Sequence, residues 1–258
     1  MNRLLIPLAI SVFLAAPLAV HAASSVYTSA SIDKGCENVG TPAPEDVDMG
    51  NVSLKCEGYR NYPFYFNAYD LPSRRVWGME TLFLHEGVPG HHFQIALAQE
   101  NAALPAFMRF GGNTAYAEGW GLYAETLWKE LGMETDPYQR FGGLNDEMLR
   151  AMRLVVDTGI HWKGWHRDEA IDYMLANSGM SRTEATAEVE RYIAIPGQAL
   201  AYKIGALTIQ RLKAKAMKEL GPKFDPREFH AQVLMTGALP MEVLEKKIDS
   251  WIAAKKAA

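Results

Sequence analysis

The order of hydrophobic and polar residues predicts helices from about residue 75 to the C-terminus. Residues 113–131 are rich in Ala, Leu and Glu, which favour helices, and Asn113 or Thr114 can cap the first turn. Ser181 and Glu184 form a capping-box pattern at the start of another helix. Further helices are predicted within residues 136–159, 167–179, 181–193, 197–221, 225–237 and 240–254. The sequence therefore indicates a mainly α fold.

The chain ahead of this helical part has a different pattern. Residues 23–61 are polar and show no helical period, which predicts an irregular arm. Residues 62–71 alternate aromatic and polar groups, which is typical of a short strand. We therefore predict three parts: a leader at residues 1–22, the arm at 23–61, and a helical domain at 62–258.

The leader has the layout of a secretory signal peptide. A basic residue near the start is followed by an apolar run over residues 4–20 and by Ala22, a small residue suited to cleavage. The alternative is a membrane anchor, but the run is at the lower limit for a span and contains Pro7 and Pro17. We expect cleavage after Ala22, a periplasmic or secreted protein, and no stable membrane anchor afterwards.

The chain contains two cysteines, Cys36 and Cys56, both in the expected arm. In an oxidising compartment their proximity in sequence favours a disulfide. The alternative is a pair of zinc-binding thiolates, for which this stretch offers no close partners.

Composition and charge narrow the class of protein. The chain has 258 residues, of which 48% are hydrophobic and 22% charged, enough for one domain of ordinary size or two small ones. The formal net charge is −4 and there is no basic block. These values argue against nucleic-acid binding through phosphate contacts.

The stretch "LHEGVPGHHFQ" raises the question of a metal site. His85 is followed directly by Glu86, as in zinc peptidases, where a second histidine normally comes four residues after the first. Here His91 and His92 come six and seven residues later. A regular helix would place neither beside His85 at the short distances that zinc requires.

Pro89 and Gly90 lie between the histidines and can interrupt the regular helix that would keep them apart. Pro89 lacks an N–H and disrupts a helix, and Gly90 tolerates unusual dihedral angles. A two-residue bulge would return His91 to the position of the missing second ligand. We favour His91, with His92 as the alternative.

A catalytic zinc site also needs a third protein ligand and a general base. Glu118, in a predicted helix with apolar and small neighbours, is the candidate ligand, and Glu86 is the candidate base. Glu125 lies two turns after Glu118 and can support a ligand from behind. The alternative is that the histidines form a polar helix end and that Glu118 faces solvent.

Several stretches together resemble the bacterial family called domain of unknown function 885: "HEGVPGHHFQ", "YAEGWGLYAE", "DTGIHWKGW", "ERYIAIPGQALAYKIG" and "FDPREFHAQVLMTGALPMEVLE". The resemblance covers about residues 62–251 and implies a helical, zincin-like metallopeptidase. It implies the ligands His85, His91 and Glu118, with Glu86 as the base. Family members are much longer, so the chain is expected to represent their C-terminal catalytic half, with a partner or a dimer closing the cleft.

Other polar residues are candidates for substrate contacts. Tyr202 can donate a hydrogen bond to the oxyanion of a tetrahedral intermediate, or it can be a core tyrosine. His161 and Arg191 can hold a peptide carbonyl or a terminal carboxylate, or can form structural bonds instead. Gln198 lies one turn before Tyr202 and can line the same wall. His230 is expected to pack beside the preceding phenylalanine without a chemical role.

These residues predict an exported, zinc-dependent hydrolase that cleaves peptide bonds. Two alternatives remain open at this point. One is a zinc-containing binding or structural module without turnover. The other is a hydrolase with the same metal that acts on an ester or a non-peptide amide.

Overall fold

The structure of this chain is a computed structural model, and it describes residues 54–56, 59–61 and 76–257. The chain divides into two units, Met1–Arg75 and Val76–Ala258, which are described separately. The leader and the predicted strand at 62–71 lie outside the described residues. The proposed Cys36–Cys56 disulfide also lies outside them, because Cys36 is not described.

A short hairpin is described in the first unit. Strands β1 (Leu54–Cys56) and β2 (Tyr59–Asn61) pair antiparallel, with Cys56 opposite Tyr59. This corrects the expectation of an arm that is irregular throughout residues 23–61. Strands of three residues are too short for an alternating pattern to stand out in the sequence.

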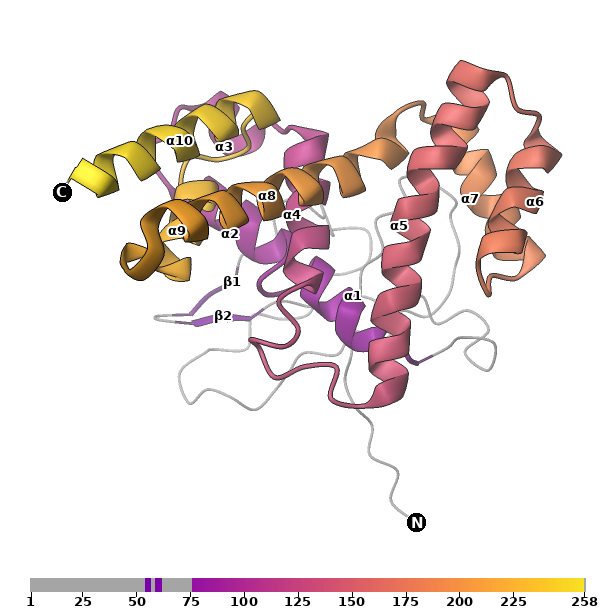
Figure 1. The fold of residues 1–258 in the computed structure, drawn as a ribbon, viewed down its shortest axis with the longest axis horizontal. Coiled ribbons are helices and arrows are strands. Elements are labelled where there is room, and N and C mark those ends of the chain that lie inside the picture. Colours follow the sequence, from indigo (N-terminus) through magenta and orange to yellow (C-terminus); the bar gives the residue numbers. More distant parts are fainter. Residues whose placement is uncertain (1–53, 57–58, 62–75, 258) are drawn as a thin grey trace, which may run out of the picture. The chain divides into compact units, whose positions relative to one another are not determined.

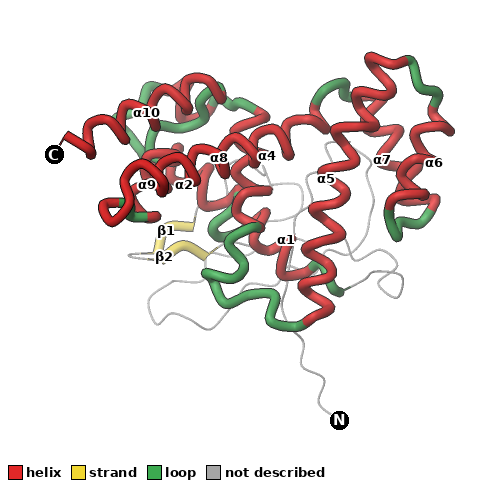
Figure 2. Tube along the Cα trace, viewed as in Figure 1, coloured by secondary structure: helices red, strands yellow, loops and turns green. Residues whose placement is uncertain are grey.

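The second unit is helical, which confirms the mainly α class (Figures 1 and 2). Its α-helices are α1 (Met79–Glu86), α2 (His91–Glu100), α3 (Ala106–Phe110), α4 (Thr114–Glu125), α5 (Pro137–Lys163), α6 (Arg167–Asn177), α7 (Arg182–Ala194), α8 (Gln198–Leu220), α9 (Pro226–Leu234) and α10 (Met241–Ala257). A short 3-10 helix, η3 (Gly221–Lys223), follows α8.

Two hydrophobic clusters hold these helices together. The first joins α4 and α8 to α9 and α10, and the second joins the C-terminal part of α5 to α6 and α7, as the grouping in Figure 1 shows. The long helix α8 contacts both α4 and α5. The largest fully buried side chains of the first cluster are Trp120, Tyr116, Tyr123, Phe229, Ile209, Leu212, Leu244 and Ile248.

Helices α4 and α8 meet at glycines. A Cβ atom on Gly205 would lie 1.9 Å from the carbonyl oxygen of Ala115, and one on Gly119 would lie 2.5 Å from the Cα of Gly205. No side chain fits at either position, so the two backbones approach closely. This contact sets the face of α4 that carries Glu118 beside the start of α8.

Most predicted helix starts are confirmed. The Asn113 side chain accepts a hydrogen bond from the backbone N–H of Tyr116 and caps α4. Ser181 and Glu184 form the capping box of α7. These caps depend only on neighbouring residues, so the sequence alone predicts them.

Two helix ends differ from the prediction. Helix α5 continues past Gly159 to Lys163, and the next residue, Gly164, has a φ of 74°. Gly159 lies inside the helix because the Trp165 ring packs against it, with Cε3 only 2.4 Å from where a Cβ would be. Helix α4 ends at Glu125, ahead of the predicted residue 131. The difference in α5 arises from tertiary packing rather than local preference.

Candidate metal centre

The histidine motif lies where α1 gives way to α2. His85 is in the last turn of α1 and His91 is the first residue of α2. The Val88–Pro89 peptide bond is cis, and a Cβ on Gly90 would lie 1.8 Å from the carbonyl oxygen of His85. The predicted bulge inside one helix is therefore a break between two helices, and only glycine fits at its last position.

The break returns His91 to His85, as the bulge was expected to do. The two imidazole rings lie edge to face with their centroids 4.6 Å apart. The adjacent His92 is not part of this cluster. The chain thus places the His-Glu pair and the second histidine on separate helices that converge.

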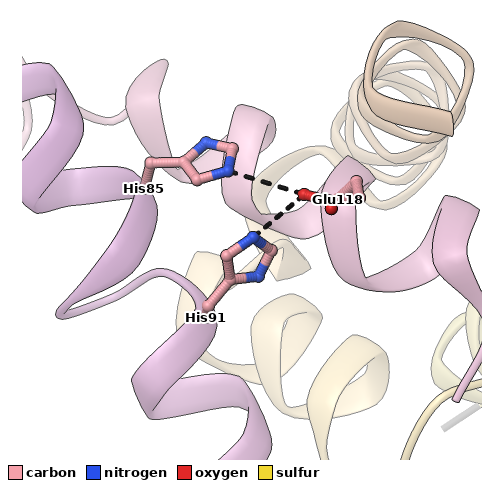
Figure 3. Close-up of side chains that lie close together, drawn as sticks. All are labelled: His85, His91 and Glu118. Carbon is pink, nitrogen blue, oxygen red and sulfur yellow. Dashed lines mark hydrogen bonds and ion pairs between the residues drawn. The ribbon is translucent and has the colours of Figure 1, made fainter. Parts of the chain in front are cut away.

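Glu118 reaches the two histidines from α4 (Figure 3). Its Oε2 atom lies 3.0 Å from His91 Nε2 and 3.7 Å from His85 Nε2. The three candidate ligand atoms all lie within 4.8 Å of one another. The structure therefore brings together all three residues that the sequence suggested as ligands.

Gly121 makes room for the histidine rings, and sequence reasoning did not single it out. A Cβ at this position would lie 2.9 Å from both Cε1 and Nε2 of His85 and 3.0 Å from Cε1 of His91. Gly121 comes three residues after Glu118 on α4, so it shares a face with that residue.

A carboxylate and an arginine hold His85 from behind. His85 Nδ1 lies 2.7 Å from Glu125 Oε1, and Arg150 Nη2 lies 3.3 Å from the same oxygen. All three side chains are nearly buried. A bond at Nδ1 fixes the ring orientation and directs Nε2 toward Glu118, as is usual for histidines that bind metals. Arg150 was missed in the sequence because it comes from the distant helix α5.

The neighbouring carboxylates change the pKa of His85, and the two histidines change the pKa of Glu118. Burial alone would lower the pKa of His85, but the neighbouring Glu118 and Glu125 outweigh this effect and raise the pKa to about 9. Burial likewise opposes ionisation of Glu118, yet the two histidines hold its pKa well below the usual range.

Glu86, the candidate base, is the last residue of α1. Burial raises the pKa of its carboxyl group, and the charges of His85 and His91 partly oppose that increase. A carboxylate with a raised pKa accepts a proton more readily than an exposed one.

Three polar side chains, Gln198 and Tyr202 of α8 and Arg191 of α7, form a wall next to Glu118. Gln198 Nε2 donates to Glu118 Oε1 at 3.2 Å and to the hydroxyl oxygen of Tyr202 at 3.1 Å. Arg191 Nη2 donates to the same hydroxyl at 3.0 Å and to Gln198 Oε1 at 3.1 Å. The Tyr202 ring also stacks on His85, with centroids 6.1 Å apart. The predicted Gln198, Tyr202 and Arg191 are thus connected to the ligand cluster.

Three further residues support this wall and were not found from the sequence. The guanidinium carbon of Arg153 lies 4.5 Å from the centroid of the Tyr202 ring. Arg153 also donates to Glu188 at 2.7 Å and to the hydroxyl of Tyr192 at 3.0 Å. These residues come from α5 and α7, so only the fold shows their proximity to Tyr202.

Two histidines lie in other surroundings. His161 Nε2 is 3.0 Å from the backbone oxygen of Tyr192, a bond that ties α5 to α7 rather than to the ligand cluster. His230 packs against Phe229 as expected, and its Nε2 lies 2.7 Å from the hydroxyl of Tyr123. Burial, together with the charge of Lys213, lowers the pKa of His230 to about 4.

Comparison with known proteins gives the family. The family model described as "Bacterial protein of unknown function (DUF885)" matches residues 53–248. The chain belongs to this family. No curated protein matches the chain. Among the described helices, none is long and apolar enough to cross a membrane.

Two solved structures are similar to this DUF885 chain. A "putative lipoprotein" from Colwellia psychrerythraea is 46% identical, with a TM-score of 0.72, over 76% of this chain and 33% of that one. A "putative lipoprotein of unknown function" from Shewanella oneidensis is 24% identical, with a TM-score of 0.64, over 80% of this chain and 38% of that one. This chain therefore spans about a third of the first protein and somewhat more of the second. The second likeness concerns the fold alone.

Proposed function

We propose that this DUF885 chain is a zinc-dependent hydrolase that cleaves peptide bonds. The observation that carries the proposal is the convergence of two histidine nitrogens and one carboxylate oxygen within 4.8 Å. Two histidines and a glutamate are a common donor set of catalytic zinc sites, which leave a fourth position open. The pattern of His-Glu on one helix and a glutamate ligand on another supports a zincin-like site.

The two distances from the Glu118 oxygen to the histidine nitrogens are close to those between the ligands of a zinc ion. Ligand atoms about 2.0–2.1 Å from zinc at tetrahedral angles are roughly 3.3 Å apart. The Glu118 oxygen lies 3.0 Å from His91 and 3.7 Å from His85, on either side of that value. Gly121 keeps a side chain out of the space beside the rings, and Glu125 fixes the orientation of His85.

When bound, zinc would lower the pKa of a water molecule and polarise the substrate carbonyl. Glu86 would take the proton from the attacking water and deliver it to the leaving nitrogen. Tyr202 accepts hydrogen bonds from Arg191 and Gln198, so its own O–H remains able to donate to the developing oxyanion. Gln198 would hold the second oxygen of Glu118 and keep that ligand in place.

An extracytoplasmic location accords with this proposal. The apolar leader at residues 4–20 is typical of a secretory signal, and the similar structures are described as putative lipoproteins. The natural substrates would then be peptides, with other amides and esters as alternatives, in the periplasm or outside the cell.

A second candidate is a zinc-containing binding module without turnover. The observation that favours it is the length difference, since the chain spans 33% and 38% of the two similar structures. In that case the metal site would bind zinc without hydrolysing a substrate.

Digestion of a peptide library separates these candidates. The zinc-loaded chain should cleave peptides, a chelator should abolish cleavage, and Glu86→Gln should retain zinc but lose hydrolysis. Glu242→Gln, the same change at an exposed position of α10, is the matched control and should retain both. Zinc binding without cleavage by the unaltered chain would refute the peptidase and support the binding module.

A further inference from the structure

Two arginines lie beside Tyr202 with one glutamate between them. Two arginines, Arg153 and Arg191, share one carboxylate, that of Glu188. Arg153 takes most of it, with Nη2 2.7 Å and Nε 3.2 Å from Glu188 Oε2. Arg191 Nη1 comes no closer than 3.7 Å to the other oxygen. One guanidinium charge is therefore left without a full counter-charge.

Arg191 retains hydrogen-bond donors for an incoming group. Among the residues that the structure describes, its hydrogen bonds leave from Nη2, to Gln198 and to Tyr202. The N–H groups of Nε and Nη1 have no hydrogen-bond acceptor in this part of the chain. The side chain is 17% exposed, compared with 6% for Arg153, so a ligand can reach it.

Arg191 is also linked to the candidate metal ligand Glu118 through the side chain of Gln198. Gln198 Nε2 is 3.2 Å from Glu118 Oε1, and Gln198 Oε1 is 3.1 Å from Arg191 Nη2. One amide group thus separates the ligand carboxylate from the guanidinium. In a peptide, the terminal carboxylate lies one residue beyond the last peptide bond, roughly 3.3–3.6 Å of extended chain. A substrate with its last peptide bond at the metal would therefore carry its terminal carboxylate toward Arg191, which Gln198 connects to the ligand Glu118.

We propose that Arg191 binds the C-terminal carboxylate of the substrate and that the site removes one residue at a time from a free C-terminus. This inference rests on the proposed function. In the step, the water oxygen bonds to the carbonyl carbon and the C–N bond breaks. One water proton passes through Glu86 to the leaving amine. The products are a shortened peptide and a free amino acid, so the step needs no other reactant.

The test compares pairs of N-blocked peptides that differ only in a free or an amidated C-terminus. A hydrogen bond between charged groups contributes about 1.5–3 kcal/mol, so kcat/KM should be roughly 10- to 100-fold higher for the free acid. In Arg191→Gln this ratio should fall to about one. Arg182→Gln, an exposed arginine on the same helix that pairs with Asp172, is the matched control and should keep the ratio.

The ratio separates recognition from a structural role. Arg191 also orients Tyr202, so its loss should slow hydrolysis of both peptides. A purely structural Arg191 would lower both rates equally and leave the ratio unchanged, which would overturn the inference. Mass spectrometry of a longer peptide should show loss of single C-terminal residues, and internal cleavage would also overturn it.

A binding measurement tests the role of Arg191 without requiring hydrolysis. Calorimetry on zinc-treated Glu86→Gln should show tighter binding of the free acid than of the amide, by roughly 10-fold or more, and Arg191→Gln in this background should remove the difference. Equal affinities would refute the role of Arg191 even if the chain hydrolyses peptides. Absence of zinc from the chain would refute the proposed function instead.

Discussion

Replacing Gly121 by alanine would place a methyl group between the two histidine rings without removing a ligand. The added carbon would lie 2.9 Å from His85 Nε2 and 3.0 Å from His91 Cε1. The rings would have to withdraw by about 0.5 Å to reach the separation of about 3.5 Å at which carbon contacts become favourable. Zinc sites tolerate distance changes of only about 0.2 Å. His85 cannot yield freely because Glu125 holds it at 2.7 Å. We therefore expect zinc affinity to fall by about 10- to 100-fold.

Zinc titration with a competing chelator measures this loss, and thermal unfolding without metal provides the comparison. Alanine in place of a helical glycine contributes roughly 1 kcal/mol to helix stability, which offsets part of the clash in the metal-free protein. Gly112→Ala is the control, because an added Cβ there meets nothing within 4 Å. If Gly121→Ala binds zinc as tightly as the unaltered chain, the geometric reasoning is wrong.

Four further changes test other parts of the account. Tyr202→Phe should retain zinc and lower kcat by roughly 100- to 1000-fold, because it removes a donor to the oxyanion; an unchanged kcat would exclude that role. Glu125→Gln weakens the support at His85 Nδ1 and should lower zinc affinity at least about 10-fold in the same titration. Gly205→Ala should destabilise the fold by about 3 kcal/mol in urea denaturation, since its Cβ would lie 1.9 Å from a carbonyl oxygen of α4. Folding lowers the pKa of His230 from about 6.5 in the unfolded chain to about 4. The folded state therefore keeps its full stability above pH 6.5 and loses part of it as the pH falls toward 4, because the unfolded chain then binds a proton more readily. The free energy of unfolding of the unaltered chain should therefore decline across that window by roughly 1–2 kcal/mol more than that of His230→Gln, less than the full pKa difference gives because water partly screens this side chain. Parallel curves would contradict the assignment.

The features that local sequence determines were predicted well. The caps at Asn113 and Ser181, the mainly α class and the interruption at Pro89-Gly90 follow from the preferences of neighbouring residues. The chemistry and spacing of His85, His91 and Glu118 indicate a metal site in the sequence alone, and the structure places these residues together.

The features that depend on tertiary contacts were not predicted. Arg150 and Arg153 reach the site from α5, far away in sequence, and no local pattern marks them. Gly159 ends a helix by local preference but lies inside α5, because Trp165 packs on it. The same applies to Gly121, since only the neighbouring rings show why a side chain cannot fit there.

The central claim is that His85, His91 and Glu118 bind one zinc ion, and metal analysis of paired variants tests it most directly. After zinc loading and desalting, the unaltered chain should hold about one zinc per molecule, since three protein ligands and a water fill a tetrahedral site. His91→Ala should lose the metal, whereas the neighbouring His92→Ala should retain it. Retention of zinc by His91→Ala together with its loss from His92→Ala, or the absence of zinc from the unaltered chain, would contradict the account.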